Sequence, residues 1–205
     1  MTDPTNQSPL VYLVDDDDAV RDGLALLLAS VGLRSVGFGD PRDFLAQRHA
    51  YAIGCLVLDI RMPGTSGLQV LEDVAAHSDL PVIMLTGHAN VDLCRRAFKT
   101  GAVEFLQKPV DDDLFLEAVQ AAVRQHIASR EKQAATREAA QRLARLSGRE
   151  EEVLRRVVEG VSNKQIARDL GLSPRTVETY RANVFAKLEA DSLAQLIRQY
   201  AVLLA

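Results

Sequence analysis

The first 124 residues alternate short apolar runs with amphipathic segments, and this alternation constrains the fold more than any other feature of the chain. The apolar runs have the length and character of strands buried on both faces of a sheet, and they cover residues 10–14, 35–38, 55–58, 82–85 and 103–106. Apolar residues at helical spacing occupy residues 19–30, 41–47, 68–77, 91–100 and 114 onward. The pattern predicts an α/β fold, in which a doubly wound, five-stranded parallel sheet carries helices on both faces.

The rest of the chain has a different, all-helical pattern. Residues 110–146 contain no glycine or proline and many alanines, so the last helix of the α/β region is expected to continue into a linker. Large apolar residues are nearly absent between Ile127 and Leu143, which favours a solvated helix over a coiled coil. Four short helices are then expected, beginning at Ser147, Ser162, Ser173 and Asp191.

Length and charge support two domains. A chain of 205 residues that is 47% hydrophobic has material for more than one minimal core. Net charge is −8 over residues 1–124, +3 over 125–145 and +1 over 146–205. We therefore predict an α/β domain over 10–124, a helical linker over 125–145 and a smaller all-α domain over 146–205.

The sequence gives no sign of a membrane or of a secretory signal. No run approaches the ~18 apolar residues that a membrane helix needs, and the N-terminus is polar and lacks a basic start. Cys55 and Cys94 fit no metal-binding spacing, so we interpret both as small buried hydrophobic residues in a reducing compartment. A cytoplasmic location without membrane contact is expected.

Polar side chains stand at the carboxyl ends of four of the expected strands. Asp15 and Asp16 follow the first, Asp59 ends the third, Thr86 ends the fourth and Lys108 follows the fifth. Because parallel strands end at one edge of the sheet, all five should meet there.

Three carboxylates, a hydroxyl and an ammonium at one edge of a sheet are typical of a site for phosphoryl transfer assisted by a cation. Three clustered carboxylates repel one another unless a hard divalent cation binds them, so Mg²⁺, or Mn²⁺ in its place, is the expected cofactor. Such an ion would stabilise charge on a phosphoryl group during attack by Asp59, which would become an acyl phosphate. Lys108 offers a positive charge to a phosphoryl oxygen, and the Thr86 hydroxyl a hydrogen bond.

Simpler interpretations remain for each part. An Asp-rich turn such as residues 15–18 is often only a helix N-cap with solvated charges, and Lys108 before proline can be an ordinary turn. An enzyme that hydrolyses an aspartyl phosphate is also conceivable, but such enzymes commonly need a second acid–base carboxylate. Arg61 stands two positions after Asp59, where such a carboxylate would be expected.

Residues 10–124 resemble the receiver domains of two-component response regulators. The matching motifs are Val14-Asp15-Asp16, Leu58-Asp59-Ile60-Arg61-Met62-Pro63-Gly64, Leu85-Thr86-Gly87-His88 and Phe105-Leu106-Gln107-Lys108-Pro109. The resemblance implies a flavodoxin-like fold with Asp59 as phospho-acceptor. It implies Asp15, Asp16, Asp59 and the backbone carbonyl of Arg61 as metal ligands, Thr86 with Phe105 as a switch pair, and a cis peptide bond before Pro109.

Residues 146–205 resemble the LuxR-type helix-turn-helix, so the whole chain is similar to the FixJ branch of the NarL family. On a helix beginning at Pro174, Val177 and Val184 face inward together with Tyr180 and Leu188. The opposite face can enter a major groove of DNA, with Glu178 and Thr179 near bases and basic residues near phosphates. The DNA-binding residues predicted in this way are Lys164, Ser173, Arg175, Thr176, Glu178, Thr179, Arg181, Ala182 and Lys187.

An alternative for the rear domain is a helical bundle that docks or dimerises proteins through a solvated charged face. The resemblance favours a transcriptional regulator without enzymatic turnover. A sensor histidine kinase would phosphorylate Asp59, the receivers would form a homodimer, and paired rear domains would bind double-stranded DNA. Contact with RNA polymerase and activation of transcription are expected.

Overall fold

The computed structural model describes residues 8–47, 52–88 and 90–204. The chain divides into two compact units, Met1–Arg130 and Glu131–Ala205, and each is described by itself.

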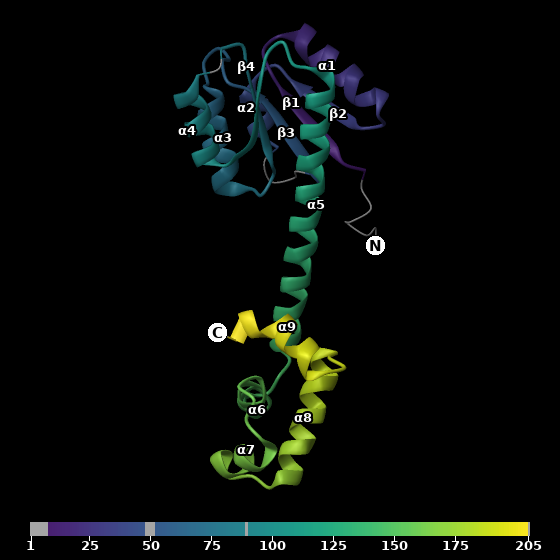
Figure 1. Ribbon diagram of the computed structural model, residues 1–205, viewed down its shortest axis with the longest axis vertical. Coiled ribbons are helices and arrows are strands. Elements are labelled where there is room, and N and C mark those ends of the chain that lie inside the picture. Colours follow the sequence, from purple (N-terminus) through teal and green to yellow (C-terminus); the bar gives the residue numbers. More distant parts are fainter. Residues whose placement is uncertain (1–7, 48–51, 89, 205) are drawn as a thin grey trace. The chain divides into compact units, whose positions relative to one another are not determined.

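The first unit is built on a five-stranded parallel sheet, as predicted (Figure 1). Its strands lie in the order β2-β1-β3-β4-β5. The chain first extends the sheet from β1 to β2 on one side and then continues from β3 on the other side of β1. In open α/β sheets, ligands bind in the crevice at the carboxyl ends of the two strands where this switch occurs, here β1 and β3. The strands are β1 (Leu10–Val14), β2 (Arg34–Phe38), β3 (Gly54–Asp59), β4 (Val82–Thr86) and β5 (Ala102–Gln107).

Helices cover both faces of this sheet and enclose two hydrophobic cores. One core contains Phe44, Leu71 and Ala97 from α2, α3 and α4, against alternate strand residues such as Leu56. The other contains Leu28 from α1 and Phe115, Val119 and Val123 from α5, against the strand residues of opposite parity. The helices are α1 (Asp18–Ser30), α2 (Pro41–Leu45), α3 (Gly67–His77), α4 (Val91–Thr100) and α5 (Asp112–Leu143).

The two edge strands differ from the prediction. All residues of β3 and β4 are buried, but β2 and β5 are mostly half-buried or exposed. The expectation of five strands buried on both faces is therefore wrong for β2 and β5, because an edge strand has a neighbour on one side only. Helix α2 ends at Leu45, two residues earlier than predicted.

The two cysteines also differ from each other. Cys55 lies in the second core and is fully buried, and burial raises the pKa of its thiol to about 12. Cys94 is only half-buried, so the interpretation of both as buried residues holds for Cys55 alone.

Helix α5 runs without interruption for 32 residues, so the predicted continuation into the linker is confirmed. From Glu131 to Glu138 the side chains are exposed except for the half-buried Gln133, as the scarcity of large apolar residues predicts. Within the part of the chain that the structure describes, no helix is both long and apolar enough to cross a membrane.

The second unit combines the end of α5 with four short helices. Ala139 and Leu143 of α5 pack against a core that contains Leu154, Leu188 and Tyr200. A neighbouring core joins α6, α7 and α8 through Val157, Ile166 and Val177. The short helices are α6 (Gly148–Val158), α7 (Asn163–Leu170), α8 (Pro174–Leu188) and α9 (Leu193–Leu204).

Three of the four predicted helix starts in this unit are confirmed. Ser147 caps α6 in a capping box with Glu150, and Ser162 and Ser173 cap α7 and α8. The fourth is displaced by one residue, because the hydroxyl of Ser192, and not Asp191, accepts a hydrogen bond from the first turn of α9.

Candidate functional site

The parallel register of the sheet brings the predicted acidic residues together. Val14 of β1 pairs with Leu58 of β3, so the next residues, Asp15 and Asp59, are neighbours across the two strands. Asp16 follows directly in the turn that leads to α1. The turn ends where α1 begins, because Asp17 caps this helix: its side chain accepts hydrogen bonds from the amides of Ala19 and Val20.

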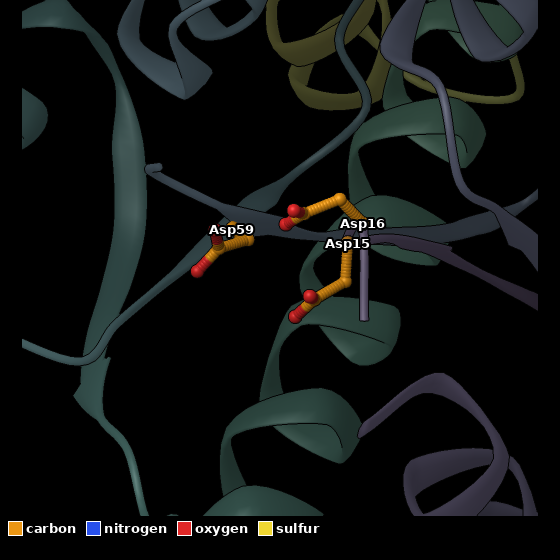
Figure 2. Close-up of side chains that lie close together, drawn as sticks. All are labelled: Asp15, Asp16 and Asp59. Atoms are coloured by element: carbon orange, nitrogen blue, oxygen red, sulfur yellow. The ribbon is translucent and has the colours of Figure 1, made fainter. Parts of the chain in front are cut away.

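The carboxyl groups of Asp15, Asp16 and Asp59 form one cluster at the ends of β1 and β3 (Figure 2). One oxygen from each lies within 4.8 Å of the others. Asp15 and Asp59 are 3% and 5% exposed, whereas Asp16 is open to solvent. The N-cap interpretation of the Asp-rich turn applies to Asp17, whereas Asp15 and Asp59 are nearly buried and belong to the cluster.

Lys108 lies against two of these carboxylates. Its Nζ is 2.5 Å from Asp15 Oδ2 and 3.0 Å from Asp59 Oδ1. Burial raises the pKa of Asp59, and Lys108 opposes that change while the charge of Asp15 adds to it. For Lys108 burial acts to lower the pKa, but the hydrogen bonds with Asp15 and Asp59 prevail, so the net change is upward. The peptide bond between Lys108 and Pro109 is cis, as the resemblance implied.

Thr86 is the last residue of β4, and Phe105 lies on the adjacent strand β5. The Thr86 hydroxyl is fully buried and lies 3.2 Å from both the amide and the carbonyl of His88. Phe105 is half-buried and packs against the first core of the sheet. Their action as a switch pair stays a prediction.

Arg61 approaches the site through its backbone. Its amide donates a hydrogen bond of 2.9 Å to Asp59 Oδ2, which orients the carboxylate. Beside Asp16 there is an open hollow lined by residues 60–66. The role of the Arg61 carbonyl as a metal ligand stays a prediction.

This donor set fits a hard divalent cation. Three carboxylates converge, two of them nearly buried, and oxygen is the ligand atom that Mg²⁺ prefers. Among the described residues, Lys108 is the one ammonium that pairs with this cluster, and one positive charge does not balance three carboxylates. A bound cation would relieve the remaining repulsion.

Helix α8 exposes one face that carries Arg175, Glu178, Thr179 and Ala182 of the predicted DNA-binding residues. The turn between α7 and α8 needs Gly171, which has φ 66° and ends α7 in the left-handed conformation. Val177 and Val184 are buried, whereas Glu178, Thr179 and Ala182 are exposed, as the helical spacing predicts. Arg175 is exposed as well, and Thr176 is half-buried.

Two of the basic residues in this region have partners inside the unit. Lys187 Nζ lies 2.6 Å from Glu150 Oε2, and Arg181 donates a hydrogen bond of 2.8 Å to the side chain of Asn163. Lys164 is exposed. Lys164 is thus better placed than Lys187 to meet a phosphate, although both roles stay predictions.

Sequence reasoning missed two residues and one pairing. Arg21 donates to the backbone beside the acidic cluster, and the buried His126 contacts the start of β3, at the opposite end of that strand from Asp59. The capping role of Glu150 was predictable, but its pairing with Lys187, 37 residues away, was not. The contacts of His126 and Lys187 join residues far apart in the sequence and have no local sequence signal.

The fold and the acidic cluster define a receiver domain, and the helix-turn-helix unit makes the protein a regulator of transcription. The family model described as "Response regulator receiver domain" matches residues 11–120, and that described as "Bacterial regulatory proteins, luxR family" matches residues 144–200. The chain belongs to the NarL/FixJ family of two-component response regulators.

Similar proteins cover nearly the whole chain. The transcriptional regulatory protein FixJ of Azorhizobium caulinodans is 46% identical over 189 residues, which are 92% of this chain and 90% of that protein. FixJ of Bradyrhizobium diazoefficiens is 42% identical over 189 residues, 92% of each chain. The solved structure of the response regulator StyR has a TM-score of 0.86 and 38% identity, covering 96% of this chain and all of that one.

Proposed function

We propose that Asp59 accepts a phosphoryl group from a sensor histidine kinase, and that this modification promotes dimerisation and sequence-specific binding to DNA. The observation that carries the proposal is the position of Asp59 Oδ1, 3.0 Å from Lys108 Nζ and within the cluster of three carboxylates. An acyl-phosphate site needs this combination of a nucleophilic carboxylate, a cationic partner and a place for a divalent ion.

Asp15, Asp16 and Asp59 would hold Mg²⁺ or Mn²⁺, with the Arg61 carbonyl as a further ligand. When bound, the ion would neutralise charge on the phosphoryl oxygens. The amide of Arg61 holds one oxygen of Asp59, which leaves the other beside Lys108 as the attacking atom. That oxygen forms a bond to phosphorus as the phosphorus–nitrogen bond to the kinase histidine breaks, and the leaving imidazole keeps the electron pair.

Lys108 and Thr86 would act on the transferred group. The Lys108 ammonium already spans Asp15 and Asp59, so it can exchange part of that contact for a phosphoryl oxygen. The Thr86 hydroxyl would leave His88 to donate to another oxygen, and Phe105 would move into the space that Thr86 vacates. This movement would shift the receiver toward the dimerising state, in which paired α8 helices meet two half-sites.

Labelling with acetyl phosphate and Mg²⁺ tests the acceptor. The full-length protein should gain one base-labile phosphoryl group by mass spectrometry, and Asp59→Asn should abolish the gain. Asp22→Asn, which changes an exposed acid of α1, is the matched control and should label like the wild type. Equal labelling of Asp59→Asn and the wild type would refute the assignment.

The same samples test the later steps. Phosphorylation should raise the dimer fraction in sedimentation experiments and tighten binding to DNA with paired half-sites. Transcription in vitro with RNA polymerase would then show whether the promoter is activated, as we expect.

A further inference from the structure

Arg21 of α1 extends its side chain across the carboxyl end of the sheet. The side chain is 16% exposed and lies over two glycines of the β2 region. A Cβ added at Gly37 would come within 3.4 Å of Arg21 Cδ, and one added at Gly39 within 3.4 Å of Nη1. A side chain longer than alanine at either position would therefore compete with Arg21 for this space.

The guanidinium has two partners at the acidic turn. Its Nη1 donates a hydrogen bond of 2.6 Å to the carbonyl oxygen of Asp15, and its Nη2 pairs with the Asp18 carboxylate. The Asp15 carbonyl belongs to the peptide that joins Asp15 to Asp16. Arg21 therefore fixes the orientation of the peptide from which Asp16 extends.

Asp16 depends on this peptide more than its neighbours do. The Asp15 amide donates to the carbonyl of Phe38, and the Asp15 carboxylate accepts from Asp17 and Lys108. Asp16 is exposed, and among the described residues its carboxylate accepts no hydrogen bond. Among the residues that the structure describes, the backbone of the turn alone holds the Asp16 side chain near Asp59.

We propose that Arg21 is a positioning residue of the phosphoryl-acceptor site, which holds the Asp15–Asp16 peptide so that Asp16 presents an oxygen to a divalent cation. The inference rests on the proposed function, because it takes the acidic cluster as a cation site. Arg21 contacts neither the cation nor the phosphoryl group and acts through the backbone.

Arg21 has two opposite effects on a bound cation. Its positive charge would repel the ion, but that charge is paired with the exposed Asp18 carboxylate and is screened by solvent, so the repulsion is weak. Loss of a contact that orients a metal ligand typically costs about 10- to 100-fold in affinity. The orienting effect should therefore dominate.

The choice of arginine follows from its shape. A planar guanidinium donates to Asp15 and Asp18 at once, whereas a lysine ammonium is a compact charge on a shorter side chain. Arg21→Lys keeps the charge and the aliphatic stem but loses the two-pronged contact. Arg21→Gln loses both the charge and the contact.

Calorimetric titration of the full-length proteins with Mg²⁺ tests the inference. We expect Arg21→Gln to weaken Mg²⁺ binding about 10-fold or more and Arg21→Lys to fall between it and the wild type. Arg42→Gln, which removes an exposed arginine paired with Asp40, is the control and should bind as the wild type does. If Arg21→Gln proves unfolded by circular dichroism, Arg21→Lys alone must still bind Mg²⁺ more weakly than the wild type.

Labelling by acetyl phosphate over a range of Mg²⁺ concentrations separates positioning from general damage. In Arg21→Gln, half-maximal labelling should require more Mg²⁺, while the rate at saturating Mg²⁺ approaches that of the wild type. Unchanged or tighter Mg²⁺ binding by Arg21→Gln, or a lower rate at saturation without a shift in the Mg²⁺ requirement, would overturn the inference. The Mg²⁺ titration keeps its meaning even if Asp59 proves not to be the acceptor, because it measures no phosphorylation.

Discussion

Glu150, a nearly buried carboxylate, joins the start of α6 to the end of α8. Its Oε2 accepts hydrogen bonds from the amide and hydroxyl of Ser147, at 2.7 and 2.9 Å, and lies 2.6 Å from Lys187 Nζ. The hydrogen bond from Lys187, followed by that from the Ser147 amide, lowers the pKa of Glu150 to about 2. The ionised carboxylate thus favours the folded state.

This lowered pKa predicts how stability depends on pH. The stabilisation of the folded state by the ionised Glu150 is complete above its ordinary pKa of 4.5. It is lost as the pH falls toward 2, because the carboxylate of the folded protein is then protonated as well. At neutral pH, Glu150→Gln should lower the free energy of unfolding by about 1–2 kcal/mol, and the difference from the wild type should shrink below pH 4.5. Urea titrations at several pH values measure this.

Glu152→Gln provides the control. Glu152 pairs with Arg149 on the surface, with both side chains about half exposed, so its loss should change stability little at any pH. A constant difference between Glu150→Gln and the wild type from pH 7 to 3 would contradict the assigned pKa.

Gly67 determines how closely α3 approaches the acceptor strand. A Cβ at this position would lie 2.2 Å from the carbonyl oxygen of Asp59, so the backbone could not keep its place. Gly67→Ala should lower the free energy of unfolding by about 1–3 kcal/mol and reduce labelling of Asp59. Gly23→Ala is the matched control: no atom lies near its added Cβ, and alanine should stabilise α1 by about 0.5–1 kcal/mol. Thermal unfolding and acetyl phosphate labelling of both variants check this pair of outcomes.

At the scale of elements, α5 is held to the amino-terminal end of β3 by a buried histidine. His126 is fully buried, its Nδ1 lies 2.9 Å from the Gly54 carbonyl, and its Nε2 accepts a hydrogen bond of 3.0 Å from Arg130. Asp79 completes the cluster, 3.0 Å from Arg130. These contacts hold the last turns of α5 that belong to the first unit.

Replacing this histidine should loosen α5 locally. His126→Leu removes the side-chain partner of the Gly54 backbone and one of the two partners of Arg130, which should cost about 1–3 kcal/mol. Hydrogen exchange followed by mass spectrometry should show faster exchange in peptides from β3 and from α5 near His126. His77→Leu, at an exposed histidine of α3, should leave these peptides unchanged; similar protection in His126→Leu and the wild type would argue against the anchoring role.

The exposed residues of α7 and α8 predict that base reading and phosphate contact can be separated by mutation. Lys164→Ala should weaken binding to all DNA sequences and reduce the salt dependence by about one unit of slope, because it removes one phosphate contact. Glu178→Ala should change which sequences are preferred. A binding-site selection and salt titrations distinguish the two, and an unaltered preferred motif for Glu178→Ala would exclude base reading there. Lys187→Ala should also lower stability, because Lys187 pairs with Glu150.

For the whole molecule, the end of α5 belongs to the second unit's core, which affects how that unit can be isolated. Leu143 packs in its core, and Arg142 pairs with Glu189 at 2.8 Å. A fragment of residues 131–205 should therefore be more stable than one of residues 146–205. Comparison of their thermal unfolding tests this directly.

The longer fragment also tests how phosphorylation acts. The exposed part of α5 offers few large apolar side chains for a packed interface, so we expect phosphorylation to act through dimerisation, which raises the effective concentration of the second DNA-binding unit. Residues 131–205 alone should bind a half-site weakly, and fusion to an unrelated dimer should restore tight binding to the paired site. Gel-shift titrations decide, and a fragment that binds far more tightly than the unphosphorylated full-length protein would instead indicate inhibition by the receiver.

The sequence alone determined the features that repeat or act locally. The alternation of apolar runs predicted the parallel sheet, because strand and helix periods differ, and serines before apolar segments predicted three helix starts. The acidic cluster was also predictable, since Asp15, Asp59 and Lys108 each follow or end a strand and parallel strands end at one edge.

Only the tertiary structure decided the features that depend on distant neighbours. The exposure of β2 and β5 follows from strand order, which the periodicity of a single strand does not contain. The contacts of Arg21 with Asp15, of His126 with Gly54 and of Lys187 with Glu150 arise because long side chains reach groups on other elements or across a turn. Their energies depend on burial and geometry, and these exist only once the chain has folded.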